Sequence, residues 1–140
     1  MPLLEFERGV LRIGCEAWNA LVGEQDSPFL EWGFLASLED SHCVNARSGW
    51  QPRPLVLRER GELLAACPLY AKEHSEGEFV FDWPWAEAAQ RAGIDYYPKW
   101  LVGVPFTPVT GARILVRADA DRPSVLRLFA GALRELCLSN

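Results

Sequence analysis

The chain has 140 residues, of which 49% are hydrophobic and 24% are charged, and its formal net charge is −5. These are the values of a globular protein, and a chain of this length can bury a core as one domain. The composition therefore excludes a mainly disordered chain. The basic residues are scattered rather than clustered. Because nucleic-acid binding needs a basic patch, we expect no DNA partner.

The cysteines and the apolar runs predict a protein of a reducing compartment. Four widely spaced cysteines form no C-x-x-C motif. Cys67 and Cys137 lie in apolar runs, where free cysteine behaves as a small hydrophobic residue. No secretory signal is recognisable, and no apolar run approaches the roughly 18 residues that a membrane-spanning helix needs. We therefore expect a cytoplasmic location, reduced thiols and no membrane span.

The N-terminal residues predict a strand followed by two helices. Residues 4–13 indicate a strand or a bent pair of strands, and residues 15–22 indicate a short helix. Ser27 can cap a second helix, since Pro28 suits the first helical position, where a missing N–H has no partner. This second helix is expected to end near Ser41.

A loop over residues 44–54 precedes a predicted antiparallel hairpin. Two apolar runs, 54–59 and 62–71, are joined by Arg60 and Gly61, and glycine supplies the positive φ of a tight turn. Pro68 lies inside the second run and should mark an edge or a bulge, because proline cannot donate to a strand ladder.

Shorter elements are expected in the second half of the chain. Residues 79–82 predict a strand, and Asp82 is placed to cap a helix over 83–92. Further extended segments are expected at 99–104 and 113–116.

The last predicted helix has the clearest pattern. It is expected to run from 122 to 138, with Asp121 as its cap, and its apolar residues recur at spacings of three and four along one face. Such a face must be buried on a sheet or on another helix. Because the sequence stops directly after this helix, we expect that a longer parent domain contributes further strands.

Common catalytic and metal-binding motifs are poorly supported. His42 adjoins Cys43, but sequence neighbours do not face each other in a helix, and His74 is the remaining histidine. No zinc-ligand spacing and no phosphate-binding glycine loop is recognisable. We expect no metal site.

Aromatic residues are concentrated between 79 and 106, which a core of bulky side chains would explain most simply. The alternative is a pocket with aromatic walls, whose polar groups would be Asp82, Lys99, Thr107 and Thr110. Acidic residues in this region could include a general base, although such residues in loops are usually just solvated; they are Glu76, Glu78 and Asp82.

Three phrases carry a resemblance to a known family. They are PLYAKEHSEGEFVFDW (68–83), YYPK (96–99) and PFTPVTG (105–111). With the helix after Ser27, they make residues 27–140 resemble the bacterial FemAB-like family of peptidoglycan biosynthesis or recognition. The resemblance implies the acyl-CoA N-acyltransferase (GNAT-type) fold, of which residues 1–140 would be the N-terminal portion of one domain.

The resemblance also implies where ligands bind. In that fold a helix N-terminus faces the donor, here the helix at 122–138, and the loop 105–113 would form a wall of the site. The implied donor-side residues are Phe106, Thr107, Thr110, Gly111 and Arg113. The implied acceptor-side residues are Asp82, Trp83, Tyr97 and Lys99.

The sequence departs from the usual GNAT pattern before that helix. The pyrophosphate-binding signature Q/R-x-x-G-x-G/A is absent, and Asp119 and Asp121 would repel a phosphate. The donor is therefore left open between acyl-CoA and an aminoacyl compound. The resemblance transfers no catalytic residue to this chain.

These observations predict a partial GNAT-like α/β fold with a mostly antiparallel sheet flanked by helices. The expected parent protein is an acyl- or aminoacyl-transferase that acts on an amine, with a small molecule or a cell-wall precursor as substrate. Residues 1–140 alone are expected to be inactive. The alternatives are a non-catalytic module that binds a glycan or peptide through residues 79–106, and an assembly piece that forms a homo-oligomer through an exposed sheet edge.

Overall fold

The computed structural model describes residues 1–139 and confirms the mixed α/β class, with antiparallel strands and flanking helices. The architecture is consistent with a partial GNAT-like fold. In chain order the elements are β1 (Leu3–Phe6), η1 (Val10–Arg12), α1 (Cys15–Asn19), η2 (Pro28–Leu30), α2 (Trp32–Asp40), β2 (Trp50–Pro52), β3 (Leu55–Glu59), β4 (Glu62–Cys67), β5 (Leu69–Lys72), α3 (Trp83–Arg91), β6 (Lys99–Val102), β7 (Leu115–Val116) and α4 (Arg122–Leu138).

The strands form two antiparallel sheets that continue into one another. One sheet has the order β1-β3-β4-β7 and the other β2-β5-β6. The β4 and β5 strands are separated only by Pro68, which cannot donate to a ladder. Two backbone bonds cross the break: Arg53 N donates to Leu69 O (2.8 Å), and Gly103 N donates to Pro68 O (3.2 Å). The two sheets are therefore halves of one bent surface.

The predicted hairpin is confirmed. The β3 and β4 strands pair antiparallel, and both turn residues, Arg60 and Gly61, have positive φ (52° and 85°). This is the backbone that a two-residue hairpin turn requires.

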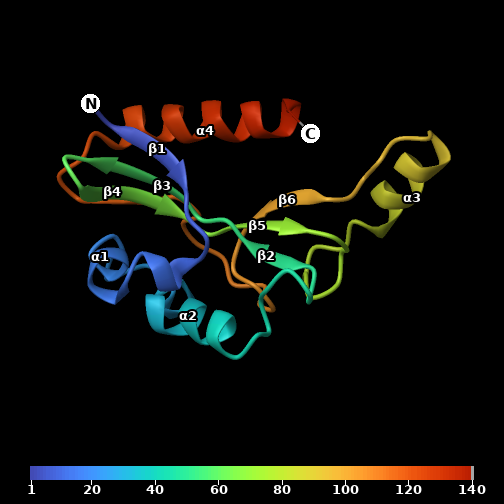
Figure 1. The fold of residues 1–140 in the computed structure, drawn as a ribbon, viewed down its shortest axis with the longest axis horizontal. Helices are drawn as coiled ribbons and strands as arrows, with labels where there is room; N and C mark the ends of the chain where they lie inside the picture. Colours follow the sequence, from blue (N-terminus) through green and yellow to red (C-terminus); the bar gives the residue numbers. More distant parts are fainter. Residues whose placement is uncertain (140) are drawn as a thin grey trace.

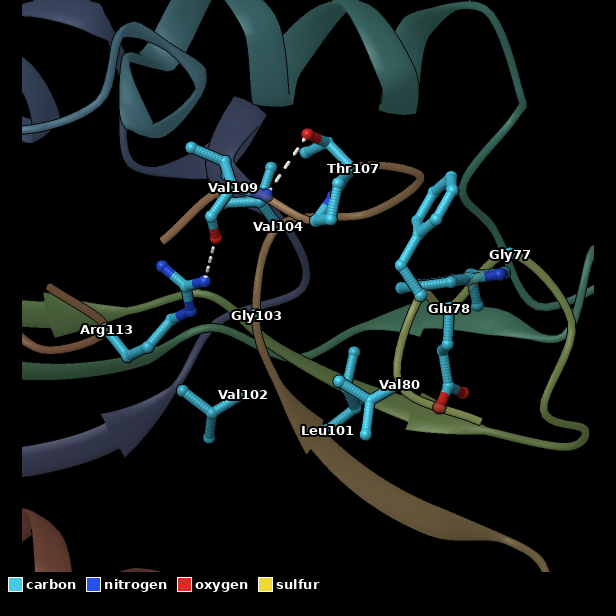
Figure 2. A pocket seen from close by; sticks show the side chains of 13 residues that line it. Gly77, Glu78, Val80, Leu101, Val102, Gly103, Val104, Thr107, Val109 and Arg113 are labelled. Carbon is cyan, nitrogen blue, oxygen red and sulfur yellow. Dashed lines mark hydrogen bonds between the residues drawn. The ribbon is translucent and has the colours of Figure 1, made fainter. Parts of the chain in front are cut away.

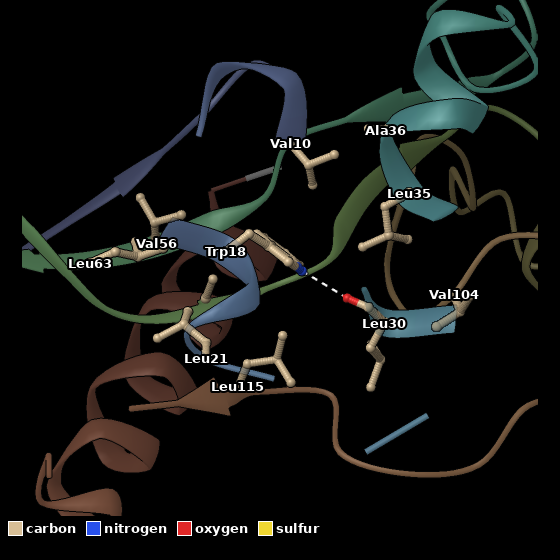
Figure 3. Close-up of a cluster of buried hydrophobic side chains, with 11 residues drawn as sticks. Val10, Trp18, Leu21, Leu30, Leu35, Ala36, Val56, Leu63, Val104 and Leu115 are labelled. Atoms are coloured by element: carbon tan, nitrogen blue, oxygen red, sulfur yellow. Dashed lines mark hydrogen bonds between the residues drawn. The ribbon is translucent and has the colours of Figure 1, made fainter. Parts of the chain in front are cut away.

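Helices cover both faces of the four-stranded sheet (Figure 1). On one side α4 packs Phe129 against alternate strand residues such as Leu55 and Leu57. On the other side α1, α2 and η1 surround Trp18, whose indole N–H donates to the carbonyl of Leu30 at 2.8 Å (Figure 3). The central strands β3 and β4 are therefore covered on both faces. The apolar face predicted for the last helix, α4, packs against the four-stranded sheet of this chain.

The structure corrects several predicted elements. Residues 79–82 form no strand, and the carboxylate of Asp82 makes no capping bond to α3. Asp121 likewise precedes α4 without a side-chain cap. Part of the 4–13 segment is the 3₁₀ turn η1, and the loop expected at 44–54 contains β2. Each correction concerns a short segment, where tertiary contacts outweigh local preference.

The segment from 73 to 98 leaves the sheet after β5 and returns as β6. It carries α3, which stands away from the rest of the molecule in Figure 1 and buries no side chain. The expected aromatic core is therefore wrong for the first part of this region. Its large apolar side chains are exposed instead; they are Phe79, Val80, Phe81, Trp83, Trp85 and Ile94.

None of the described helices is long and apolar enough to span a bilayer. Within residues 1–139 all four cysteines are free thiols. Cys67 is buried, as its apolar context predicts, whereas Cys137 is exposed.

Candidate functional site: two pockets beside one ion-pair network

The first pocket lies where the chain departs from the sheet after β6. Its volume is about 440 Å³, and its walls are β6, residues 77–80 and the loop that follows Gly103. Most of the lining is apolar, whereas its charged residues are Glu78 and Arg113. Figure 2 shows these two side chains on opposite sides of the pocket. A mostly apolar cavity with a few placed polar groups is typical of a small-molecule site.

The 105–113 loop is held in shape by its own hydrogen bonds. The guanidinium of Arg113 donates to the carbonyls of Val109, Gly111 and Ala112. The Thr107 hydroxyl accepts from Val109 N at 3.3 Å. Arg113 forms no ion pair within the described chain. Because three of its five donors are used, it retains donors and a full charge for an anionic ligand group.

Phe106 fixes this loop to the segment that opens the 73–98 excursion. Its backbone has φ of 60°, a rare value for a residue with a side chain, and its N–H donates to Gly77 O at 3.2 Å. Its ring lies 5.0 Å from the ring of Trp50. Phe106 thereby joins the two loop segments that form walls of the first pocket, residues 77–80 and the loop after Gly103.

A network centred on Lys99 lies beside this pocket. The Lys99 ammonium donates to Ser75 Oγ (2.8 Å), to Glu78 Oε2 (2.8 Å) and to the carboxylate of Asp82. Asp82 also accepts from the Tyr96 hydroxyl at 2.7 Å. The Tyr97 hydroxyl lies 2.6 Å from Ser75 Oγ. Residues from a loop, a helix start and a strand are therefore tied together at one point.

Lys72 is a second, fully buried cation in the same network. Its ammonium lies 3.6 Å from the centroid of the Trp50 ring, donates to Glu76 O at 2.8 Å, and lies 3.6 Å from Glu78 Oε1. The two lysines balance the charges of Glu78 and Asp82. The network as a whole is therefore neutral, which is the condition for burying charges at tolerable cost.

Burial and hydrogen bonding move several pKa values. Burial lowers the pKa of Lys72 to about 8, against the opposing effect of Glu78. Burial also raises the pKa of Tyr96 to about 12, and the hydrogen bond to Asp82 adds to this. For Asp82 burial acts upward, but the bonds from Lys99 and Tyr96 outweigh it and lower its pKa to about 2. At neutral pH Asp82 is ionised and Tyr96 is a neutral phenol.

The second pocket lies between α3 and the returning segment. Its volume is about 560 Å³. Its aromatic lining consists of Trp83, Tyr96 and Tyr97, and its polar lining includes Glu87 and Asp95. Since Glu78 lines the first pocket and Tyr96 and Tyr97 line the second, the Lys99 network connects the two.

The sequence-predicted residues are divided between these places. Thr107 and Arg113 line the first pocket, whereas Phe106, Thr110 and Gly111 do not. Asp82, Tyr97 and Lys99 meet in the network, and Trp83 lines the second pocket. All three N–H donors of Lys99 are engaged internally, so it positions other groups rather than binding a ligand.

The start of α4 does not reach the first pocket. Arg117, just before this helix, pairs with Glu62 at the beginning of β4 (3.7 Å). The loop after Gly103 instead leaves the sheet beside Pro68, at the other end of β4. The helix terminus that the resemblance implies for the donor therefore lies apart from the 105–113 wall.

Sequence reasoning missed Lys72, Ser75 and Trp50. Lys72 ends an apolar run and is followed by polar residues, so it reads as a solvated strand end. Only the pairing of β5 with β2, which places Lys72 opposite Trp50, reveals its burial. Glu78 was recognisable as an acidic candidate, but not as the partner of two lysines.

Comparison with known proteins supplies the family. A family model described as FemAB-like, peptidoglycan biosynthesis/recognition, matches residues 9–140. The chain belongs to this family. Its role is accordingly related to peptidoglycan, and the sequence resemblance is confirmed over a longer range than its motifs alone cover. No curated protein matches this FemAB-like chain, and no solved structure matches it. Its placement in the GNAT superfamily is compatible with the fold described above.

Proposed function

We propose that this FemAB-like chain forms part of an acyl- or aminoacyl-transferase that modifies an amine on a cell-wall precursor. One observation carries the proposal: two pockets of different chemistry flank one ion-pair network. The first, with an apolar wall and Arg113, suits an acyl or aminoacyl donor that has an anionic group. The second, with three aromatic rings and carboxylates, suits the acceptor.

The reaction would be the attack of a neutral amine on the carbonyl carbon of a thioester or ester. A C–N bond forms, the C–S or C–O bond breaks, and the amine's proton passes to solvent while the departing sulfur or oxygen takes up a proton. Binding donor and acceptor on one protein supplies proximity, which lowers such a barrier by roughly 7–11 kcal/mol at best, provided that the reacting atoms come within about 3.5 Å of each other. No residue of this chain is assigned as the base.

Within this proposal the donor-side residues are Phe106, Thr107, Thr110, Gly111 and Arg113. Phe106 shapes the wall through Trp50 and Gly77, and Thr107 contributes lining. Thr110 and Gly111 would act through the shape of the loop, because neither lines the pocket. On the acceptor side, Trp83 and Tyr97 would contact substrate, while Asp82 and Lys99 hold the tyrosines in place.

The test is a titration of the purified protein with acyl-CoA, an aminoacyl donor analogue and muropeptide fragments. Thr107→Trp fills the first pocket and should abolish donor binding. Ala130→Trp, at an exposed position of α4 outside the lining of both pockets, is the control and should bind the donor normally. Failure of both donor classes to bind the wild-type protein saturably would rule out the donor assignment.

A second candidate is a non-catalytic module that holds a glycan or peptide, or that assembles with another copy. The exposed aromatic side chains between 79 and 85 favour it, because contiguous apolar surface of this kind commonly marks an interaction site. Muropeptide binding that is lost in Trp83→Ala, together with an absence of donor binding, would support this module over the transferase.

A further inference from the structure

The second pocket combines aromatic rings and carboxylates with no basic residue in its lining. Trp83, Tyr96 and Tyr97 supply the rings, and Glu87 and Asp95 supply the acids. Aromatic faces carry negative charge density and attract cations, above all when carboxylates stand nearby. A phosphate or carboxylate ligand would meet repulsion here, so the composition of the lining selects against anions.

The protein itself shows that two of these rings lie around an ammonium group. Lys99 Nζ lies 5.7 Å from the ring centroid of Tyr96 and 5.8 Å from that of Tyr97. The rings stand edge to face, with centroids 5.1 Å apart and planes at 86°. Their hydroxyls are fixed by Asp82 and Ser75, so both rings are oriented before any ligand arrives. Such preorganisation reduces the entropy cost of binding.

The two acids differ in how far they are already neutralised. Glu87 pairs with Arg91 at 3.1 Å, and both side chains are well exposed. Asp95 makes no ion pair within residues 1–139 and adjoins the two tyrosines in sequence. Asp95 is therefore the stronger source of attraction for an incoming cation, with Glu87 as a weaker second source.

We propose that the second pocket binds a primary alkylammonium group, held against Trp83 and the two tyrosines and neutralised by Asp95. This inference rests on the proposed function and deepens it. The acceptor amine would be recognised there as its cation, and would lose its proton to solvent before attack. A neutral sugar could also stack on the rings and donate hydroxyl hydrogen bonds to Asp95, but it carries no charge for Asp95 to neutralise. Because asparagine can still accept such a hydrogen bond, loss of binding in Asp95→Asn separates the two ligand classes.

The experiment is an NMR titration of the ¹⁵N-labelled protein with n-butylammonium chloride and, separately, with the neutral amide N-butylacetamide. We expect saturable shifts at residues 83–97 for the ammonium and none for the amide. Trp83→Ala should weaken binding by roughly 2- to 30-fold, the range expected for a cation–π contact. Asp95→Asn should weaken it by up to about 5-fold, the range expected for an exposed ion pair. Trp85→Ala is the control, because Trp85 lies on the same helix and is 72% exposed but does not line the pocket.

Three outcomes would overturn the proposal: no shifts with the ammonium, equal binding of the amide or of N-acetylglucosamine, or unchanged affinity in Asp95→Asn. An unfolding curve for each variant shows whether lost binding reflects lost structure, and Asp95→Asn, at an exposed side chain, tests the proposal even if Trp83→Ala unfolds. Thr107→Trp tests the ammonium site independently of the proposed transferase function. It should block donor binding yet leave ammonium binding unchanged. Absent donor binding with intact ammonium binding would reject the transferase alone.

Discussion

The Lys99 ammonium joins chain segments that are distant in sequence through three hydrogen bonds. It takes three oxygen acceptors from Ser75, Glu78 and Asp82, which lie far from it in the chain. An ammonium has three donors, so this coordination is complete. Its effect is to fix the direction of two carboxylates and, through Asp82, of the Tyr96 ring beside the second pocket.

Lys99→Met should therefore destabilise the protein strongly. The side chains of Lys99 and Glu78 are only 14% and 6% exposed, and removing one partner of a buried pair leaves an uncompensated charge. We expect a loss of about 3–5 kcal/mol in the free energy of unfolding, measured by urea denaturation.

Arg91→Met is the matched control, since it breaks the Glu87 pair in which both partners are largely exposed. It should change stability by less than about 1 kcal/mol. Equal effects of the two substitutions would mean that the network around Lys99 contributes no more than a surface pair.

Asp82 should make stability depend on acid pH. Its folded pKa of about 2 lies below the ordinary value of 3.8, so the ionised form is favoured in the native state. The resulting stability, about 2 kcal/mol, is present above pH 3.8 and is lost as the pH falls from there to about 2. Urea denaturation across this range measures the slope. The Asp82→Asn variant should have a flatter profile, and parallel profiles would contradict the assignment.

At the scale of elements, the junction between Gly77 and Phe106 controls the first pocket. A Cβ on Gly77 would lie 2.7 Å from an atom of the Phe106 ring and 3.1 Å from Trp50, and φ is 77°. Gly61 in the β3–β4 turn has a similar φ of 85°, but its Cβ would meet nothing within 4 Å. The two glycines therefore share backbone strain and differ in steric clash.

We expect Gly61→Ala to cost about 1–2 kcal/mol from backbone strain alone. Gly77→Ala should cost at least about 1 kcal/mol more, as an overpacked site does, and should also weaken donor binding. Thermal or urea unfolding of both variants gives the comparison. A Gly77→Ala variant no less stable than Gly61→Ala would show that the loop carrying Phe106 shifts at little cost to accommodate the added methyl group.

The predictability of each element follows from the source of its stability. The β3–β4 hairpin and α4 were predicted from sequence because turn chemistry and a single apolar stripe, both local signals, determine them. The segment at 79–82 was mispredicted as a strand because its apolar residues suit a sheet, yet no neighbouring strand pairs with it. Asp82 was predicted to cap a helix, whereas its carboxylate accepts hydrogen bonds from Lys99 and Tyr96, which are distant in sequence.

The candidate site shows the same division. Asp82, Tyr97 and Lys99 were grouped from their family motifs and do meet in space. Lys72 could not be found, because its burial depends on the β2–β5 pairing. The donor-side residues come from one loop, and sequence alone does not tell which of them face inward.

For the whole molecule, the distribution of buried side chains predicts uneven local stability. The β3 and β4 strands are covered by helices on both faces, whereas α3 buries no side chain. Local opening needs least free energy where few apolar contacts are lost. In hydrogen exchange followed by mass spectrometry, amides of α3 should exchange fastest among the α-helices and those of β3 and β4 slowest. Slow exchange in α3 would indicate that it packs against a partner.

The interrupted strand formed by β6 and β7 has a consequence for how the pocket can change. The chain leaves the ladder at Val102, opposite Leu69, and rejoins it at Leu115, opposite Ala66. The segment between Val102 and Leu115 therefore begins and ends beside Leu69 and Ala66, which are close together in the chain. Residues inserted or deleted between these anchors would remodel the wall that carries Thr107 and Arg113 while the strand register stays constant. Ligand preference could in this way diverge between relatives that share one unchanged scaffold.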